Sequence, residues 1–283
     1  MDPVEAIVAR ALEEDAAFQD VTTLAVVPAS AQAQGQIVAR QAGVLSGCAY
    51  AGAAFRQCDS DVQLLWRRGD GAAIAAGEVI LRCSGRARGL LAAERTALNF
   101  LQQLSGVATH AASCAAAAGD VDVLDTRKTV PGLRDAQKAA VRHGGGRNQR
   151  RDLADELLLK ENHFALSGLD YAGTVRRARL GARGKIVGVE ARSEEAAAAA
   201  LAAGADYVLL DNFPPAALAG VAGRLKARFP HAVLEASGGF GAHNLAQLRG
   251  SGIDRVSVGA LTHSSPALDL SFYLDPLPVE TAS

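Results

Sequence analysis

Charged and polar residues recur in the second half of the chain, each close to the end of a short apolar run. In chain order they are Asp125, Arg127 and Lys128, then Lys160, Glu190, Asp211 with Asn212, Glu235 with Ser237-Gly238-Gly239, and Gly259. A buried apolar core has no structural use for so many charged groups. We therefore interpret the series as parts of one functional site.

These residue types suit a ligand that carries several negative charges. The cations that could converge on it are Arg95, Arg127, Lys128, Arg150 and Lys160. Arginine can grip a carboxylate or phosphate through two parallel hydrogen bonds, whereas lysine supplies a point charge. The acids Glu190 and Asp211 could serve ribose hydroxyls, a hydrated Mg²⁺ ion or a developing positive charge.

Two glycine-containing segments could hold phosphate. Ser237-Gly238-Gly239 and Gly259 each follow an apolar run, and glycine lets backbone N–H groups come close to phosphate oxygens. A tight turn is the plainer explanation of the first segment taken alone. Together the two indicate a phosphate site, because β/α barrels often build such sites from their last two loops.

The apolar runs themselves indicate a parallel sheet. They are rich in Val, Leu and Ile, as in strands buried on both faces, and helical segments alternate with them. The predicted strands end near Leu124, Leu159, Val189, Leu210, Leu234 and Val258. This alternation predicts a closed or nearly closed β/α barrel, whose strands open at their carboxyl ends onto one face.

Local signals place helices between the strands. Ser193 is an N-cap candidate, and two glutamates follow it in the favourable first turn. A second helix is predicted after Pro214-Pro215. A third is predicted over residues 244–249, with Gly250 as its stop signal.

The first third of the chain follows a different pattern. An N-terminal helix precedes β-rich runs at residues 35–40 and 79–83, and a helical stretch covers about residues 91–104. This mixture predicts a separate α+β domain. The expected division is an N-terminal domain over residues 1–110, the barrel with the site over 111–270, and a C-terminal tail over 271–283.

Composition narrows the class of protein. The formal net charge of −1 argues against a general nucleic-acid binder, which usually has a basic excess. The acidic, amphipathic start does not resemble a secretion signal, and the alanine-rich stretch at residues 196–205 is too short to span a membrane. The 4 cysteines lack CxxC spacing and are expected to be buried free thiols. We expect a cytosolic protein that needs neither a membrane nor nucleic acid.

The chain resembles a known family along nearly its whole length. The segments that carry the resemblance are ALEEDAAFQD (residues 11–20), ERTALNFLQQLSGVAT (94–109), DTRKTVPGL (125–133), GGGRNQR (144–150), KENH (160–163), LDNF (210–213), LEASGG (234–239) and SVGALTH (257–263). Each segment alone is a modest signal, but the whole series in this order is specific. It is similar to the quinolinate phosphoribosyltransferases of NAD biosynthesis.

The resemblance implies an activity and an architecture. The activity is that of a pentosyltransferase that joins quinolinate to phosphoribosyl pyrophosphate and yields nicotinate mononucleotide, carbon dioxide and pyrophosphate. It requires Mg²⁺ and no organic cofactor. The implied fold is α/β, with an N-terminal α+β open-sandwich domain followed by a C-terminal β/α barrel. The implied assembly is a homodimer with its active sites at the interface.

Carried over by position, the resemblance implies a role for each candidate residue. Lys128, Glu190 and Asp211 would be catalytic, and the two acids would face the ribose and Mg²⁺. The substrates would be bound by Thr126, Arg127, Lys128, Arg150, Lys160, Glu190 and Asp211, with Arg95 reaching quinolinate from the partner subunit. The phosphates would be bound by Ser237, Gly238, Gly239, Val258, Gly259, Ala260 and His263.

Two positions depart from the family pattern. Gln149 stands where the family commonly has a histidine before the arginine, and glutamine exchanges hydrogen bonds but carries no charge. This removes support for proton transfer at that position, though not for the reaction. Gly188 stands where many relatives have a carboxylate, so Glu190 would serve alone there.

Three alternatives share some of these features. A molybdenum-transport-associated paralogue of the same superfamily has a DTRKT-like segment, although Lys160 within KENH favours the quinolinate enzyme. A Schiff-base aldolase could use Lys160 at a barrel strand end, although the surrounding arginines favour a tightly bound anion. A non-catalytic phosphate-binding barrel would leave Glu190 and Asp211 unexplained.

Overall fold

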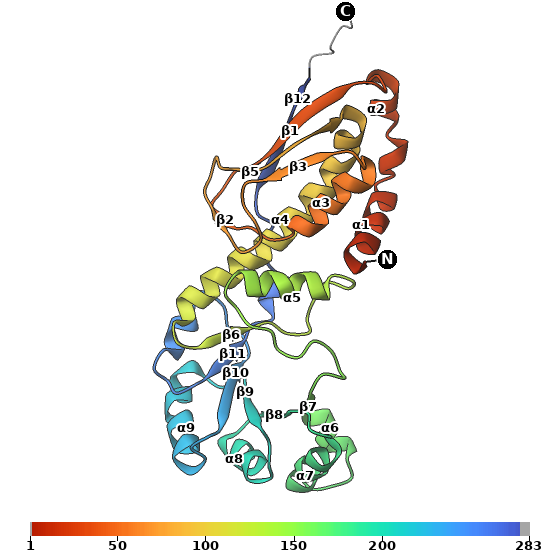
Figure 1. The fold of residues 1–283 in the computed structure, drawn as a ribbon. Coiled ribbons are helices and arrows are strands. Elements are labelled where there is room, and N and C mark those ends of the chain that lie inside the picture. Colours follow the sequence, from red (N-terminus) through yellow and green to blue (C-terminus); the bar gives the residue numbers. More distant parts are fainter. Residues whose placement is uncertain (1, 278–283) are drawn as a thin grey trace, which may run out of the picture. The chain divides into compact units, whose positions relative to one another are not determined.

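In the computed structural model, which describes residues 2–277, the chain divides into two units (Figure 1). The first unit comprises Met1–Thr109 with Ser265–Ser283, and the second comprises His110–Ser264. The boundary between them falls within helix α4, Ala87–Ala118. The predicted helical stretch at residues 91–104 lies inside this longer helix.

The first unit is built on a four-stranded antiparallel sheet with the order β12-β1-β5-β3. Its strands are β1 (Gln32–Ala39), β3 (Gln63–Trp66), β5 (Val79–Arg86) and β12 (Leu270–Pro276), and the short strands β2 (Gly43–Val44) and β4 (Ala73–Ile74) pair separately. Its helices are α1 (Pro3–Glu14), the 3₁₀ helix η1 (Ala17–Gln19), α2 (Val21–Val26), α3 (Cys48–Cys58) and the first part of α4. The prediction of an α+β domain is confirmed.

Helix α3 packs on this sheet through aromatic side chains. The rings of Phe55 on α3 and Phe272 on β12 lie 5.8 Å apart between centroids. A Cβ atom at Gly35 of β1 would lie 2.4 Å from the Phe272 ring. Because no larger residue fits beneath that ring, a glycine stands in the middle of a strand.

Strand β12 corrects the expected C-terminal tail. Residues 270–276 pair antiparallel with β1 over its length from Ala33 to Ala39. Leu270 is buried and Phe272 contacts α3, while Tyr273, the residue after Phe272, is exposed. This alternation has the period of a strand with one covered face, and it was overlooked in the sequence. Residues 278–283 of the expected tail lie outside the described residues.

The second unit contains six parallel strands in the order β6-β11-β10-β9-β8-β7. They are β6 (Asp122–Leu124), β7 (Leu157–Leu159), β8 (Val187–Ala191), β9 (Tyr207–Asp211), β10 (Val233–Ser237) and β11 (Arg255–Ser257). All five ladders between neighbours are parallel, as the sequence predicts. β6 and β7 are the edges of the sheet, so the barrel is open on that side.

Helices connect these strands much as the sequence predicts. They are α5 (Arg134–His143), α6 (Glu161–Leu166), α7 (Tyr171–Gly181), α8 (Glu194–Ala202), α9 (Pro215–Arg228), the 3₁₀ helix η2 (Leu245–Leu248) and α10 (Ala260–His263). The Ser193 side chain accepts a hydrogen bond from the N–H of Ala196, so the predicted N-cap of α8 is confirmed. The helix expected over residues 244–249 is only the short 3₁₀ turn η2, which Gly250 ends with a φ of 65°.

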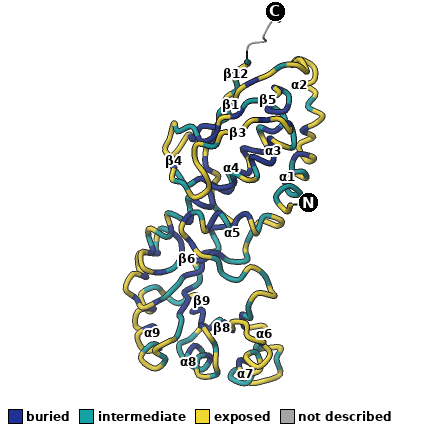
Figure 2. Tube along the Cα trace, viewed as in Figure 1, coloured by how far each residue is buried: buried dark blue, intermediate teal, exposed yellow. Residues whose placement is uncertain are grey.

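The pattern of burial along the strands shows that the polar residues lie at the strand ends. β9 and β10 are buried except near their ends, and the last residues, Asp211 and Ser237, are half-buried. Figure 2 shows the sheet of this unit largely buried, while many residues of a helix such as α9 are exposed. The carboxyl ends of the strands therefore present the polar groups. All four cysteines are free; Cys83 and Cys114 are buried as expected, whereas Cys48 and Cys58 are only half-buried.

Candidate active site

The carboxyl ends of the strands bring most of the candidate residues to one edge of the sheet. In the sheet register, Ser237 lies opposite both Asp211 and Ser257, and Ser257 lies opposite the last residue of β6. Lys160 follows β7, and Glu190 lies near the end of the neighbouring strand β8. Residues far apart in the sequence thus lie along one edge, as the strand ends of a parallel sheet must.

Lys160 and Glu190 form an ion pair at this edge. Nζ of Lys160 lies 2.7 Å from Oε2 of Glu190, whose side chain is only 12% exposed. The backbone N–H of Lys160 donates to Nδ1 of His163 at 2.9 Å, at the start of α6. His163 therefore orders the loop that presents Lys160.

Asp211 has two polar neighbours. Nδ2 of Asn212 donates to its Oδ2 at 2.9 Å, and Nε of Arg192 lies 3.6 Å from the same oxygen. Arg192 also pairs with Glu161. Arg192 is not among the residues predicted from the sequence, although its position directly after β8 is a usable signal.

Asn212 connects Asp211 to the glycine loop after β10. Its φ of 58° lies in the left-handed region, which asparagine tolerates better than most residues. Its N–H donates to the carbonyl of Ser237 at 2.9 Å. A Cβ atom at Gly238, whose own φ is 103°, would lie 2.1 Å from Oδ1 of Asn212. Glycine is required there, and the Ser237-Gly238-Gly239 loop is ordered together with Asp211.

The segment after β11 meets the segment after β6. A Cβ atom at Gly259 would lie 3.0 Å from Cδ of Lys128 and 3.3 Å from Nε2 of His263, so both side chains lie close to this glycine. Val258 and Ala260 flank it, and the Val258 N–H donates to the last carbonyl of β6 at 2.9 Å. Since β10 and β11 are neighbours, the two predicted phosphate loops lie side by side at the ends of adjacent strands.

Two hydroxyl groups shape the loop that carries Lys128. Oγ1 of Thr126 accepts the N–H of Lys128 at 3.1 Å. Oγ1 of Thr262 donates to the Lys128 carbonyl at 2.8 Å. Thr126 therefore acts as a turn residue here, and α10 anchors the loop.

Arg127 and Arg150, which we call the arginine pair, are cations with unsatisfied groups. The Nε atom of each is buried and makes no hydrogen bond within residues 2–277. Burial lowers the pKa of Arg127, and the nearby guanidinium groups of Arg150 and Arg134 lower it further. Arg134 was missed in the sequence. Cations gathered in this way form a site that attracts an anion.

Asp125 has a different role from the one its strand-end position suggested. It is fully buried. It accepts hydrogen bonds from Nζ of Lys138, Nδ2 of Asn148 and, at 3.0 Å, the N–H of Gln149. Its carboxylate therefore fixes the segment before Arg150 instead of facing a ligand.

Glu235 likewise does not join the strand-end group. It lies inside β10, fully buried, with Nε2 of Gln149 at 2.6 Å from one oxygen and Nε of Arg255 at 2.8 Å from the other. Burial raises the pKa of Glu235, and the Arg255 charge opposes that rise. Gln149 is thus engaged with an acid in the barrel interior.

Tyr207 explains the glycine at position 188. A Cβ atom at Gly188 would lie 2.1 Å from Cζ of Tyr207, so the ring fills the space a side chain would need. The Tyr207 hydroxyl donates to Oε1 of Glu156 at 2.8 Å, and the Arg255 guanidinium lies 4.1 Å from the ring centroid. In this chain an aromatic ring occupies the space next to position 188.

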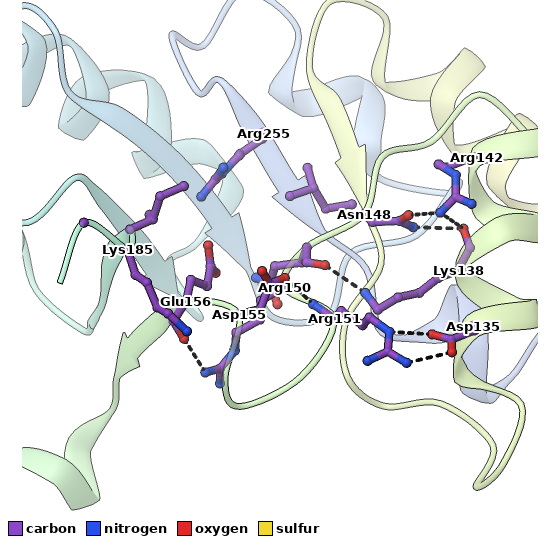
Figure 3. Close-up of a pocket in the computed structure, with 14 residues that line it drawn as sticks. Asp135, Lys138, Arg142, Asn148, Arg150, Arg151, Asp155, Glu156, Lys185 and Arg255 are labelled. Carbon is purple, nitrogen blue, oxygen red and sulfur yellow. Dashed lines mark hydrogen bonds and ion pairs between the residues drawn. The ribbon is translucent and has the colours of Figure 1, made fainter. Parts of the chain in front are cut away.

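A cavity of about 750 Å³ opens between the segment that follows β6 and the residues that precede β7 and β8 (Figure 3). Charged side chains dominate its lining, including Lys138, Arg142, Arg150, Arg151, Lys185 and Arg255, with Asp135, Asp155 and Glu156. Most of these charges are engaged already, for example Arg151 with Asp135 at 2.8 Å. Arg150 is the candidate site residue that lines this cavity.

Arg95 stands apart from the other candidates in the chain. It is exposed on α4 and belongs to the first unit, whereas the remaining candidate residues belong to the second. In the part of the chain that the structure describes, no helix has both the length and the apolar character to cross a membrane.

Comparison with known proteins gives consistent matches. The model of the quinolinate phosphoribosyl transferase N-terminal domain matches residues 20–105, and that of the C-terminal domain matches residues 107–273. A protein of Mycobacterium leprae named nicotinate-nucleotide pyrophosphorylase [carboxylating] is 39% identical over 96% of this chain and 98% of its own. The human protein of the same name is 40% identical over 88% of this chain and 85% of its own. The crystal structure of NadC from Streptococcus pyogenes superposes with a TM-score of 0.91 at 38% identity, covering 97% of both chains.

Proposed function

Since the chain belongs to the quinolinate phosphoribosyl transferase family, we propose that it transfers the phosphoribosyl group of phosphoribosyl pyrophosphate to quinolinate. The products are nicotinate mononucleotide, carbon dioxide and pyrophosphate, and the reaction serves NAD biosynthesis. The enzyme is a pentosyltransferase. The observation that carries this proposal is the similarity to carboxylating relatives across both domains.

Quinolinate has two carboxylates, and the arginine pair has buried N–H groups that a carboxylate could accept hydrogen bonds from. A carboxylate would satisfy the buried Nε atoms of Arg127 and Arg150 and reduce the repulsion between the guanidinium groups. Lys160 would supply a further positive charge from the end of β7. Thr126 would act through the turn that it forms under Lys128.

The phosphoribosyl half of the reaction would take place over Glu190 and Asp211. The phosphates would lie against the groups near the ends of β6, β10 and β11, which are Lys128, Ser237, Gly238, Gly239, Val258, Gly259, Ala260 and His263. The two glycine segments suit this role, because glycine has no side chain that could keep phosphate oxygens away from backbone N–H groups.

The acids fit a Mg²⁺ ion that arrives with the co-substrate. No group of three His, Cys, Asp or Glu side chains among the described residues could hold a metal ion by themselves. Mg²⁺ in phosphate sites usually has one or two protein carboxylates and completes its shell with phosphate and water. Glu190 and Asp211 would be those carboxylates, and the ion would help to neutralise the leaving pyrophosphate.

The chemistry needs negative charge beside the ribose and positive charge beside the pyridine ring. As pyrophosphate leaves, positive charge develops on the ribose carbon, and Glu190 and Asp211 would stabilise it while the pyridine nitrogen attacks. The nitrogen then carries a positive charge. This charge stabilises the electron pair left on the neighbouring ring carbon when carbon dioxide departs, and a proton then adds to that carbon. Lys128 would neutralise phosphate charge throughout.

The protein is further proposed to act in the cytosol as a homodimer, in which Arg95 completes the partner's site. The exposed position of Arg95 on α4 supports a contact outside its own unit. The four free cysteines are consistent with a reducing compartment.

Release of carbon dioxide from carboxyl-labelled quinolinate tests the proposal directly. Label should be released only when phosphoribosyl pyrophosphate and Mg²⁺ are both present. Nicotinate serves as the comparison substrate, since it lacks the second carboxylate that the arginine pair would hold. Robust turnover of nicotinate in place of quinolinate would contradict the proposal.

The Schiff-base alternative is less consistent with the geometry. Nζ of Lys160 is engaged in an ion pair with Oε2 of Glu190 at 2.7 Å, so the geometry offers no free amine for attack on a carbonyl carbon. Borohydride should therefore trap no substrate on Lys160.

A further inference from the structure

Arg192 adds a cation to the edge of the sheet that carries the candidate site. It directly follows β8, whose neighbours β7 and β9 lead into Lys160 and Asp211. It is 62% exposed, whereas Asp211 is 14% exposed. A solvent-facing guanidinium therefore lies beside a largely buried carboxylate.

One contact of Arg192 is solvent-exposed and the other is long. Its Nη1 pairs with Glu161, which is itself 58% exposed, and its Nε lies 3.6 Å from Oδ2 of Asp211, beyond hydrogen-bond distance. Exposed ion pairs of this kind contribute little and exchange readily. Arg192 also lines a cavity of about 320 Å³ together with Glu161 and Glu190, which gives the guanidinium room to move.

We propose that Arg192 is a binding residue for the pyrophosphate group of the co-substrate. In the ligand-free protein it rests against Asp211 and Glu161. When the ribose or its Mg²⁺ engages Asp211, the guanidinium moves to the pyrophosphate oxygens, which offer it more negative charge and two parallel hydrogen bonds. This inference rests on the function proposed above and adds a residue to the same site.

The test is calorimetry with phosphoribosyl pyrophosphate and Mg²⁺, and separately with inorganic pyrophosphate and Mg²⁺. Arg192→Met should weaken both by roughly tenfold or more, the factor expected when a charge-assisted hydrogen bond is lost. The dependence of affinity on salt should also become shallower. Quinolinate affinity should be unchanged, because the arginine pair is untouched.

Arg224→Met is the matched control. Arg224 is also 62% exposed and pairs with an acid, Glu194, at 2.6 Å, but it lies on α9, away from the strand ends. It should bind both probes as the wild type does. Arg192→Lys keeps the charge and loses the planar fork, so its affinity should fall between those of the wild type and Arg192→Met.

Unchanged or tighter pyrophosphate binding by Arg192→Met would overturn the inference, because Arg192 would then only compete for Asp211. If Arg192→Met does not fold, as judged by its thermal transition, Arg192→Lys and Arg192→Gln decide the question by the same titration. Failure of the wild type to release carbon dioxide from quinolinate would refute the proposed function instead. The two failures are therefore separable.

Discussion

The two sides of the candidate site differ in how their charges are balanced. The arginine pair, Arg127 and Arg150, has buried Nε atoms that make no hydrogen bond within the described residues. On the other side, Glu190 has Lys160 at 2.7 Å, and Asp211 has a guanidinium at 3.6 Å. Neither arginine has an ion pair among residues 2–277, whereas both acids on the other side already have a cation beside them.

This difference indicates what each side does when a ligand arrives. Unpaired cations gain a partner directly, so a dianionic ligand is bound without any ion pair having to break. Paired acids must give up a cation before they can serve a ribose or a metal ion, so binding there is an exchange. In a site that binds two anionic substrates, the unpaired arginines can serve recognition of a dianion. The paired acids can serve the ribose, whose charge changes during the reaction.

The largest effect is expected from removing one of the cations that the two subunits would contribute to a shared site. Arg95→Ala and Lys128→Ala should each nearly abolish turnover, since loss of one partner of a desolvated charge pair typically costs roughly 2–5 kcal/mol. Co-expression should rebuild one intact site per mixed dimer and restore up to about a quarter of wild-type activity if mixing is random. The measurement is the activity of purified mixed dimers, which should reach about half that of the wild type because one of their two sites is intact. Mixed dimers as inactive as both parents would place Arg95 in its own chain's site or in fold stability.

Arg150→Met should lower activity without lowering the stability of the fold. The kcat/KM for quinolinate should fall by about a hundredfold or more, because a carboxylate would lose its buried partner. The free energy of unfolding should change little, since Arg150 is half-buried, its Nε makes no hydrogen bond within the described residues, and the substitution removes one hydrogen bond, from Nη1 to the carbonyl of Glu156 at 3.3 Å. Arg147→Met is the control, because Arg147 is 71% exposed and pairs with Asp122 at 2.8 Å. A loss of stability in Arg150→Met alone would mean that Arg150 is structural.

Asn212→Gly should have a smaller effect, limited to the side of the site that contains Glu190 and Asp211. Glycine keeps the φ of 58° and the link to the Ser237 loop but removes the amide that donates to Asp211 at 2.9 Å. The KM for phosphoribosyl pyrophosphate should rise roughly tenfold while the KM for quinolinate stays constant. Steady-state kinetics with each substrate varied in turn measures this. Equal changes in both constants would indicate a general loosening of the strand ends.

Gln149→His should have the smallest effect. An imidazole N–H can donate to Glu235 as the glutamine amide does at 2.6 Å. Activity should therefore stay within about tenfold of wild type, on the order of 1.4 kcal/mol in the barrier. Gln149→Leu is the contrasting variant, since it leaves a buried carboxylate oxygen without its donor and should destabilise the fold by roughly 1–3 kcal/mol. A much larger gain in activity for Gln149→His would mean that proton transfer had been lost at this position.

The sequence by itself determines the elements whose signals are local. The cap at Ser193, the start of α9 at Pro215 and the ends of the parallel strands follow from residues a few positions apart. The order of the strand-end residues also follows from the sequence, because every strand of a parallel sheet ends at the same edge. β12 was missed because its partner, β1, lies more than two hundred positions earlier, and its own alternation is short.

Only the tertiary structure decides how the charges are paired. Composition and spacing put Glu235 and Asp125 among the strand-end acids, but the fold turns Glu235 toward Gln149 and Arg255 inside the barrel and buries Asp125 against Lys138. The same holds for Gly188, whose missing side chain is explained by the ring of Tyr207. These contacts depend on which strands are neighbours and on which way each side chain points. Those facts are set by packing between distant segments, and no local pattern contains them.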